Sequence, residues 1–540
     1  MTDQAREESP LLASVNHLGN HDSGSDSDSD PGVGGRASET WALPATTRDI
    51  PPSKRFLVLL LCLALSVLLG VGDQLVSTPL LVLEEEIICR QVHGPDPVFS
   101  GDGNPCKDKH VQGELSFLTG WATFFALVPG VIMAVPYGAV ADRYGRTPIL
   151  GLSIMGVFLN LLFSSLICVL PDTFPLRLVW LSSAAFFVGG GPTVYMAMMY
   201  TIVADISNEA QKSTAFFFLG SVIQGSALLS NPITYFVMKK SAWFSITIGL
   251  ILLALATVMA FFLPETLNQR AAVRTSSLAE ESFAEAEADG QNSRARRLLV
   301  KAIAALKHTF HAAHWLFWEH KLLGLLLLSL TMEILGRCVT FIDSQYISNR
   351  YKMTFSEAGL VESVKIFFQL LLLTTILPLT SQLLLTKFKY TAREKDLRLT
   401  QASAVLAATG IVILALAETK LFMIIGIIIS ATGVGFTFML RGLMTSLVGG
   451  HEVGLLFTSI ALVETAAALV SGPSYAKLYK IGLYLGPEWI GLPYLVAGVV
   501  LILAAVLVGI IRVSGVADHH DKRPQSREGF EGPREVEHSE

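Results

Sequence analysis

The sequence predicts an all-α membrane protein with 12 transmembrane helices, arranged as two six-helix bundles related by pseudo-two-fold symmetry. Only 16% of its 540 residues are charged, against roughly 25% in an ordinary soluble domain. Of the 85 charged residues, 41 lie in residues 1–55, 264–321 and 512–540. The two blocks between these segments are long continuous apolar runs, which favour helices over the alternating strands of a β-barrel. This pattern excludes a soluble globular protein, a disordered protein and a nucleic-acid-binding protein, which needs a basic face.

The apolar runs divide the chain into five parts. A helix that crosses a hydrocarbon core of roughly 30 Å needs about 20 apolar residues. In an N-terminal bundle over residues 54–263, the expected spans are 56–82, 113–139, 148–170, 175–203, 214–238 and 242–263. In a C-terminal bundle over residues 321–511, they are 321–346, 360–385, 399–417, 421–447, 453–478 and 489–511. The remaining parts are a disordered N-terminal tail (1–53), a central loop (264–320) and a disordered C-terminal tail (512–540).

The polar segments indicate orientation and sorting. Lys and Arg residues near the span ends are more frequent on the side of the two termini, so both termini are expected in the cytoplasm. In the N-terminal tail, Glu7, Leu11 and Leu12 fit an acidic dileucine sorting signal. The destination is then either the plasma membrane or a vacuolar membrane. Within the central loop, residues 296–321 carry apolar side chains at helical spacing and basic ones on other faces, which predicts an amphipathic helix on the cytoplasmic leaflet.

Two of the five cysteines lie outside the expected spans. Cys89 and Cys106 both fall in the first extracytoplasmic loop, where an oxidising environment permits a disulfide. The segment between them is rich in glycine and proline and is able to bring them together. The alternative is that they are ordinary loop residues that never meet.

A short charged turn separates the second and third expected spans. From Gly138 to Pro148 the chain reads GAVADRYGRTP. We interpret Gly138 as a point of close helix approach, Gly145 as the residue that permits the turn, and Asp142 as a partner for the positive N-terminus of a facing helix. A generic cytoplasmic turn, rich in basic residues, is the alternative, but it requires neither the aspartate nor this glycine spacing.

The two arginines of this turn, Arg143 and Arg146, are expected to pair with an acid at a neighbouring helix end. Asp205, at the end of the fourth expected span on the same side, is the candidate. Together these residues would form a conformational gate that stabilises one state of the protein.

The turn resembles a signature of the major facilitator superfamily, G-x-x-x-D-R-x-G-R-[KR]. Thr147 departs from it where a second basic residue is usual. Within that superfamily, Lys395–Leu397 and Arg441–Leu447 resemble a fungal branch that is distantly similar to the proton-coupled folate transporter group. The resemblance implies a transporter in which spans 1, 4, 7 and 10 line a central cavity and spans 3, 6, 9 and 12 face lipid.

A weak internal repeat agrees with this implied architecture. Gly191 and Thr201 recur as Gly435 and Thr445, each 244 residues further along the chain. Duplicated six-helix halves are a common basis of secondary transporters.

Ionisable residues inside the expected spans mark candidate functional sites, because a charge in the membrane interior is costly. The candidates for substrate binding or proton coupling, including one neighbouring amide, are Asp73, Gln74, Glu333, Arg337, Arg441 and Glu464. Further charges occur at Asp343 and Lys365. The first, seventh, tenth and eleventh spans carry the candidates, whereas spans 3, 6, 9 and 12 carry no charge between their ends.

Each candidate has a structural alternative. Glu333 and Arg337 are four residues apart on one helical face, so they form either a static pair or one that a substrate or proton opens. Glu464 has no intrahelical partner, and desolvation then favours its neutral form. It is either a proton carrier or a hydrogen-bonded acid between helices. Arg441 either binds an anionic substrate or extends to the membrane interface.

The predicted function is therefore secondary active transport of a small-molecule substrate by alternating access, with coupling to protons. A uniporter or efflux carrier, and a non-transporting membrane sensor with the same fold, are the alternatives. The sequence contains no P-loop, nucleophile elbow or zinc signature, so we expect neither an enzyme nor a bound cofactor or metal. The expected partners are the substrate, protons and the lipid bilayer, with no nucleic acid, and the expected oligomeric state is a monomer.

Overall fold

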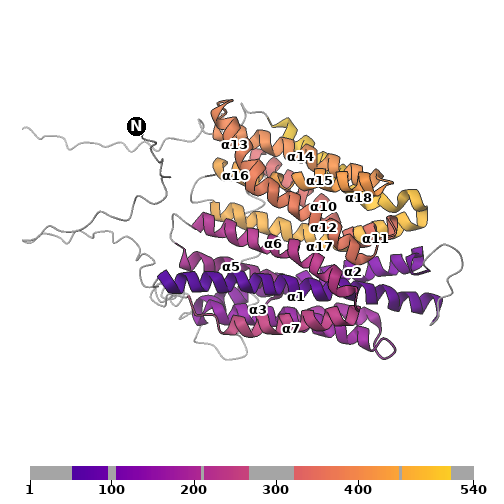
Figure 1. Ribbon diagram of the computed structural model, residues 1–540. Coiled ribbons are helices and arrows are strands. Elements are labelled where there is room, and N and C mark those ends of the chain that lie inside the picture. The colour runs from indigo at the N-terminus through magenta and orange to yellow at the C-terminus, as the bar shows by residue number, and fades with distance from the viewer. Residues whose placement is uncertain (1–51, 95–104, 208–211, 267–320, 449–452, 512–540) are drawn as a thin grey trace, which may run out of the picture. The chain divides into compact units, whose positions relative to one another are not determined.

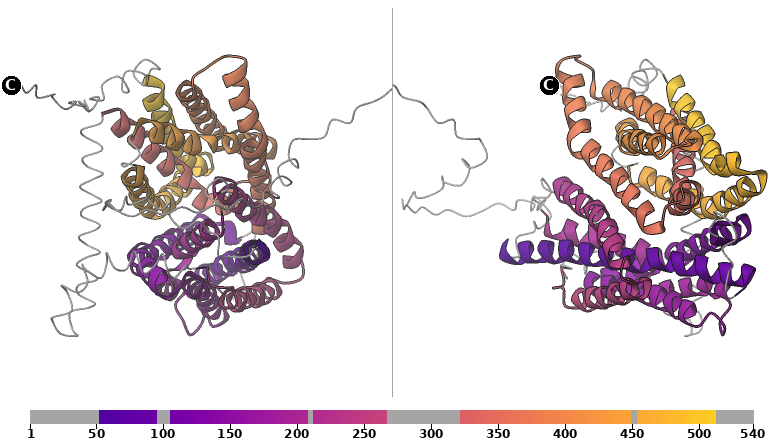
Figure 2. Two further views of the ribbon diagram at one scale, coloured as in Figure 1. Left: turned by 90° about the vertical axis from the view of Figure 1, so that its left-hand side faces the viewer. Right: turned by 45° about the vertical axis from the view of Figure 1, so that its right-hand side comes forward.

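The computed structural model describes residues 52–94, 105–207, 212–266, 321–448 and 453–511. Within these ranges the chain is almost entirely helical and contains no strand. In Figures 1 and 2 the helices of the first half, coloured indigo to magenta, lie together, and those of the second half, orange to yellow, lie together. The predicted all-α membrane class is thus correct.

The described part of the first half contains seven α-helices and three short 3₁₀ segments. They are α1 (Pro52–His93), η1 (Pro105–Lys107), α2 (Lys109–Tyr144), α3 (Arg146–Val169), η2 (Leu176–Leu178), α4 (Val179–Ser182), η3 (Ser183–Phe187), α5 (Gly191–Ile206), α6 (Lys212–Met238) and α7 (Ala242–Phe261).

Among the residues described in the second half, there are nine α-helices and three irregular helical segments. They are α10 (Lys321–Arg337), η5 (Cys338–Ile342), α11 (Asp343–Arg350), α12 (Phe355–Leu371), η6 (Leu372–Ile376), α13 (Leu377–Thr386), α14 (Ala392–Leu416), α15 (Lys420–Thr432), α16 (Gly435–Leu447), α17 (Val453–Leu485), η7 (Pro487–Gly491) and α18 (Leu492–Ile510).

The long helices run back and forth between two ends of the molecule. We call the end that carries η1, where Cys89 and Cys106 form a disulfide, the disulfide end, and the end that carries the turn from α2 to α3 the turn end. Ten helical stretches in the described part of the chain are long and apolar enough to cross a membrane. The helices α6 and α17, with 27 and 33 residues, are not among these ten but run between the same two ends. The predicted count of twelve spans depends on these two helices.

Helix α1 is longer than the sequence pattern predicted. The expected span ended at residue 82, where the apolar run stops, but α1 continues for 42 residues to His93. At a rise of about 1.5 Å per residue it is roughly 63 Å long, far more than a hydrocarbon core requires. The extension consists largely of glutamate and apolar residues, which are good helix formers, so the end of the apolar run was a poor guide to the end of the helix.

Two capping boxes begin helices in the second half. The Thr354 hydroxyl oxygen accepts a hydrogen bond from the backbone N–H of Glu357, and the backbone N–H of Thr354 donates to the Glu357 carboxylate. This box starts α12 at the disulfide end. Thr391 and Glu394 do the same for α14 at the turn end. Each box satisfies otherwise unpaired backbone N–H groups and fixes where the helix begins.

The two halves pack against each other through α2 with α17 and α6 with α12. Gly120 and Gly472 mark the closest crossing of α2 and α17: a Cβ at Gly120 would lie 2.9 Å from the Gly472 carbonyl oxygen. The Ser116 hydroxyl donates to the carbonyl of Ala476 in the same interface, at 3.2 Å. Small residues therefore allow the two helices to touch backbone to backbone.

Two crossings are broken at corresponding places in the two halves. In the fourth crossing, η3 is followed by Gly189, Gly190 and Gly191, whose φ angles are 78°, 80° and 60°. In the tenth crossing, α15 ends at Thr432 and α16 begins at Gly435. Gly191 and Gly435, the residues of the predicted repeat, each begin the half-helix that leads to the turn end. Such paired breaks are typical of the binding region of transporters.

Candidate functional site

A group of four charges lies in the second half of the chain, away from the disulfide end and the turn end. On α10, the Glu333 carboxylate accepts an ion pair from the Arg337 guanidinium at 2.9 Å. The Glu333 side chain is 5% exposed, whereas that of Arg337 is 47% exposed. Arg337 lies near the middle of the candidate span Lys321–Arg350. Because a charge facing hydrocarbon at that depth is costly, we expect its exposed guanidinium to face water rather than lipid.

The second pair of the group joins two helices. Arg441 of α16 donates to the Glu464 carboxylate of α17, and their side chains are 31% and 29% exposed. The sequence identified both residues separately but gave Glu464 no partner, because the two meet only in the folded bundle, where α16 and α17 both pack against α10. Glu464 is therefore an ion-paired carboxylate here rather than an isolated one.

The two pairs influence each other electrostatically. Glu333 is stabilised by Arg337 and Arg441 and repelled by Glu464. One Glu333 carboxylate oxygen and the Arg441 Nε–H are buried with no hydrogen-bond partner in the described part of the protein. The four side chains balance in charge, but their hydrogen bonds are incomplete.

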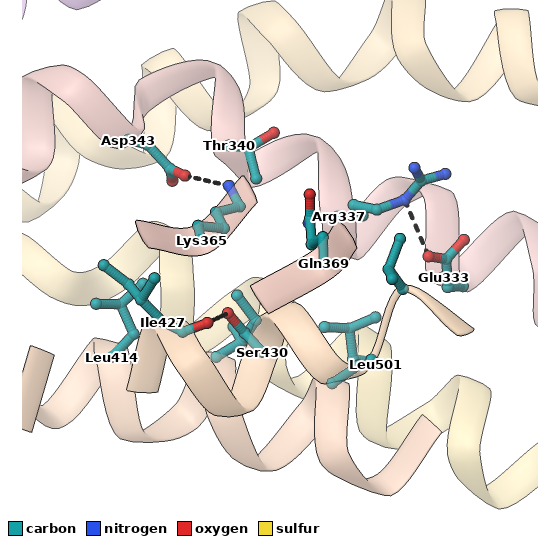
Figure 3. Close-up of a pocket in the computed structure, with 14 residues that line it drawn as sticks. Glu333, Arg337, Thr340, Asp343, Lys365, Gln369, Leu414, Ile427, Ser430 and Leu501 are labelled. Atoms are coloured by element: carbon teal, nitrogen blue, oxygen red, sulfur yellow. Dashed lines mark hydrogen bonds and ion pairs between the residues drawn. The ribbon is translucent and has the colours of Figure 1, made fainter. Parts of the chain in front are cut away.

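A buried network beside this group holds α11, α12 and α18 together. The Lys365 ammonium lies 2.8 Å from Asp343 and 3.6 Å from Glu362, and the Tyr494 hydroxyl donates to the other Asp343 oxygen at 2.6 Å. Figure 3 shows Lys365 directed at Asp343, and Arg337 directed at Glu333, along one wall of a small pocket. The pocket has a volume of about 50 Å³, too small for an organic substrate, so this network is a structural connection within the half.

The turn end carries a second charged cluster. Arg146 of α3 pairs with Asp205 at the end of α5, and its guanidinium also donates to the Thr201 carbonyl at 3.1 Å. Asp142 lies 3.8 Å from Arg146 but is 73% exposed. Gly145 adopts a φ of +112°, a conformation that glycine reaches without strain. The structure thus places Arg146 and Asp205 together and Asp142 at the edge of the cluster.

Three expectations for this turn differ from the structure. The carboxylate at the N-terminus of α3 is Glu265 rather than Asp142: it accepts from the backbone N–H of Arg146 at 3.1 Å and of Thr147 at 3.2 Å. It also accepts from the Thr147 hydroxyl at 2.7 Å. Asp142 does not take this position because it still belongs to the last turn of α2, whereas Glu265 follows α7 and faces α3 end-on.

The other two differences concern Arg143 and Gly138. The Arg143 guanidinium lies over the ring of its neighbour Tyr144, 5.6 Å from the centroid, so only Arg146 reaches Asp205. A Cβ at Gly138 would meet nothing within 4 Å. No helix approaches closely there, because the short separations of α2 occur nearer the disulfide end.

At the disulfide end, Cys89 and Cys106 form a disulfide that closes a segment with a sequence separation of 17. The bond fixes η1 against α1, and Lys107 of η1 then reaches both halves. Its ammonium lies 2.7 Å from Glu85 of α1 and 2.8 Å from the Ser348 hydroxyl of α11. Burial lowers the pKa of the Lys107 ammonium, and the neighbouring Glu85 opposes that shift.

Further polar contacts close the same end. Gln345 of α11 donates to the backbone carbonyl of Gln112 on α2 at 2.7 Å, and Lys480 of α17 pairs with Glu114 of α2 at 2.8 Å. These polar contacts join the two halves at the disulfide end. This end is therefore closed in the conformation described.

The remaining candidates lie apart from these clusters. Asp73 on α1 is half-buried and has no hydrogen bond or ion pair to another described residue, and the Gln74 amide donates to Thr78 at 3.0 Å. Glu7, Leu11 and Leu12 of the proposed sorting signal lie outside the described residues, as does most of the expected amphipathic helix at 296–321.

Two acids that the sequence interpretation missed are Glu84 and Glu265. Glu84 was taken as a loop residue beyond the first span, but it is buried in α1 with 7% exposure. For Glu265, the sequence alone indicates no interaction partner. The run of three glutamates after an apolar segment was a usable signal for Glu84, because such residues readily extend a helix. No comparable local signal identified Glu265.

A model of the Major Facilitator Superfamily matches residues 110–473, about two thirds of the chain. The chain belongs to this superfamily. The MFS efflux pump atnC of Emericella nidulans is 30% identical over 482 residues, covering 87% of this chain and 90% of that protein. The efflux pump ustT of Aspergillus flavus is 26% identical over 429 residues, covering 77% and 80%.

Solved structures agree on the fold. The crystal structure of a D-xylose-proton symporter superposes with a TM-score of 0.54 at 13% identity, covering 84% of this chain and 97% of that one. A bacterial homologue of the iron transporter ferroportin in an inward-facing state gives a TM-score of 0.53 at 12% identity, with coverages of 83% and 99%. The protein is accordingly an integral, multi-pass membrane transporter of the major facilitator superfamily and not an enzyme.

Proposed function

We propose that this transporter exports a small organic molecule in exchange for protons, by alternating access. Two of its relatives are named efflux pumps, which supports the direction. In this proposal the turn end and both termini face the cytoplasm. The disulfide end faces the cell exterior or a vacuolar lumen, where oxidising conditions maintain Cys89–Cys106. The protein works as a monomer in either the plasma membrane or a vacuolar membrane.

The conformation supports loading from the turn end. At the disulfide end the halves are joined by Lys107, Gln345 and Lys480. Arg337, near mid-span, is nevertheless half-exposed, so water reaches the charged group from elsewhere. A substrate entering from the turn end would meet the Arg337 and Arg441 guanidiniums before it reaches the closed end.

The proposed coupling of transport to protons rests on the interhelical Arg441–Glu464 pair, which lies beside the buried Glu333. Protonation of Glu464 removes the charge that holds Arg441. The unpartnered oxygen of Glu333 then becomes the stronger acceptor for the same guanidinium. Moving Arg441 from α17 toward α10 changes the packing of three helices, which links proton uptake to a conformational change.

The experiment begins with the substrate. Secreted metabolites of cells with and without the protein are compared, and the compound most depleted from the medium without it is tested in inside-out vesicles. An imposed pH gradient, acidic inside, is expected to drive uptake. Glu464→Gln should remove the dependence on the gradient while the protein still folds, and Glu488→Gln, an exposed glutamate in η7, should transport normally.

Other outcomes assign a different function. Uptake that persists unchanged after the pH gradient is collapsed identifies a uniporter and contradicts proton coupling. A protein that binds the compound but moves none of it is a sensor with the transporter fold. Full retention of gradient dependence in Glu464→Gln removes this residue from the coupling step.

A further inference from the structure

Three consecutive glutamates near the disulfide end of α1 have three different environments. Glu86 is exposed and pairs with Arg90 one turn further along. Glu85 is buried but pairs with Lys107 at 2.7 Å and accepts from the Gln112 amide. Glu84 is 7% exposed and has no hydrogen bond or ion pair to any residue that the structure describes. Of the three, only Glu84 is a buried carboxylate without compensation.

Glu84 lines a cavity of about 380 Å³ that is open on one side and is bordered by α1, α2, α3, α4, η3, η5 and α11. Small-molecule sites usually have volumes of roughly 300–1,000 Å³, so this cavity suits a small ligand. Its lining contains no lysine, arginine or histidine. Glu84 is therefore its only charged side chain.

Besides the amides of Asn160 and Gln345, the lining carries threonine and serine hydroxyls, and several of these have their hydrogens engaged elsewhere. Thr119 donates its hydroxyl hydrogen to the Leu115 carbonyl at 3.0 Å, and Thr123 donates to the Thr119 carbonyl at 3.0 Å. Ser164 similarly donates to Ser182, at 3.0 Å. With their hydrogens engaged, these hydroxyls offer lone pairs to an occupant. A carboxylate in a cavity that also offers these acceptor oxygens complements a group that carries several N–H donors.

We propose that this cavity is a second binding site, which takes a small organic monocation bearing a protonated primary amine. The ammonium group pairs with Glu84 and donates to the threonine and serine oxygens, and the ligand body fills the remaining volume. A buried ionised carboxylate costs several kcal/mol unless a countercharge is present, and such a ligand supplies it. The site is separate from the Arg441–Glu464 pair and does not depend on proton-coupled export.

The position of the cavity gives its ligand an effect on conformation. Gln345 of α11 lines the cavity and also donates to the Gln112 carbonyl across the two halves. Phe341 and Ser344, also from the second half, contribute to the same wall. A bound cation thus touches both halves beside the contacts that close the disulfide end, and it stabilises this closed state.

The test measures thermal unfolding of the purified full-length protein in detergent at neutral pH. The probes are tyramine, the neutral 4-ethylphenol and the anionic 3-(4-hydroxyphenyl)propionate, which share a phenol ring and differ in charge. Tyramine is expected to raise the Tm by several degrees because it binds only the folded state, and the other two probes should not. Glu84→Gln should lower the tyramine affinity by roughly tenfold to a hundredfold, as expected for the loss of a charge-assisted contact.

Two further variants make the result specific. Glu86→Gln removes the exposed neighbouring charge and should leave the tyramine shift unchanged. Ala122→Leu fills part of the cavity while keeping Glu84, and should reduce the shift. The proposal is overturned if no probe stabilises the wild type, if the neutral or anionic probe stabilises it as well as tyramine, or if Glu84→Gln retains the full shift. The first of these outcomes identifies a water-filled cavity around a neutral Glu84. Since no transport is measured, these results stand apart from the test of export.

Discussion

The ion pair between Arg441 and Glu464 is expected to stabilise the protein measurably, and a double-mutant cycle tests this. The variants are Arg441→Met, Glu464→Gln and the combination of both. Two unit charges about 4 Å apart at an effective dielectric constant near 20 attract by about 4 kcal/mol. Both side chains are close to 30% exposed, so they gave up part of their hydration to form the pair. An exposed ion pair adds about 0.2–1 kcal/mol to the free energy of unfolding. Removing one partner of a buried pair lowers that free energy by about 3–5 kcal/mol.

A coupling energy of about 1–3 kcal/mol is therefore expected between the two sites. The assay is unfolding of the purified protein in detergent, followed for all four proteins of the cycle. The exposed pair Glu86–Arg90, one turn apart on α1, serves as the matched control. Its cycle should give only about 0.3–0.5 kcal/mol. A coupling energy for Arg441 and Glu464 no larger than that of the control pair would refute the view that they hold α16 and α17 together.

Three further perturbations have defined outcomes. Replacing Cys89 and Cys106 by alanine should lower the free energy of unfolding by about 3 kcal/mol, because the unfolded chain loses a loop constraint. Denaturation of the oxidised wild type and of the double variant measures this difference. Glu265→Ala should destabilise the first turn of α3 by about 2–4 kcal/mol through the loss of charge-assisted and capping bonds, seen as faster amide exchange there. Gly120→Val should separate α2 from α17 at Gly472 and open the disulfide end, which maleimide labelling of a cysteine introduced at the crossing detects.

Each of these variants has a control within the chain. Cys62→Ala removes a buried cysteine outside the disulfide, and Glu265→Gln keeps an acceptor oxygen and should recover part of the loss. Gly138→Val, on the same helix as Gly120 but with no neighbour within 4 Å, should not change labelling. Equal labelling in both glycine variants would mean that the crossing does not hold the disulfide end closed, and unchanged amide exchange in Glu265→Ala would exclude its capping role.

The features that the sequence predicted well depend on local patterns. Long apolar runs identified the membrane-spanning class, and the spacing of charges in the turn indicated that Arg146 meets Asp205, because both lie at helix ends on one side. The same local pattern misplaced Asp142, since the sequence does not show which carboxylate faces the start of α3. That position belongs to Glu265, which is more than one hundred residues away along the chain.

The features that the sequence missed depend on packing between distant segments. Glu464 was recognised as an intramembrane acid, but its pairing with Arg441 follows from the angle at which α17 passes α16. Glu84 was overlooked because hydropathy marks where apolar residues stop, whereas a helix ends only where its backbone hydrogen bonds do. The different environments of Glu84, Glu85 and Glu86 could not be predicted either, since successive helical positions point about 100° apart toward neighbours that the sequence does not reveal.

The paired breaks before Gly191 and Gly435 have a mechanical consequence. An unbroken helix tilts as a rigid rod, so a movement at one end displaces the other end in the opposite direction. A crossing interrupted by glycines works instead as two short levers joined by a hinge. The parts of α5 and α16 that lead to the turn end can then swing while η3 and α15 keep their contacts near the disulfide end. In the alternating access that we propose, two gates that move independently would allow one side to seal before the other releases, and so prevent a continuous leak through the membrane.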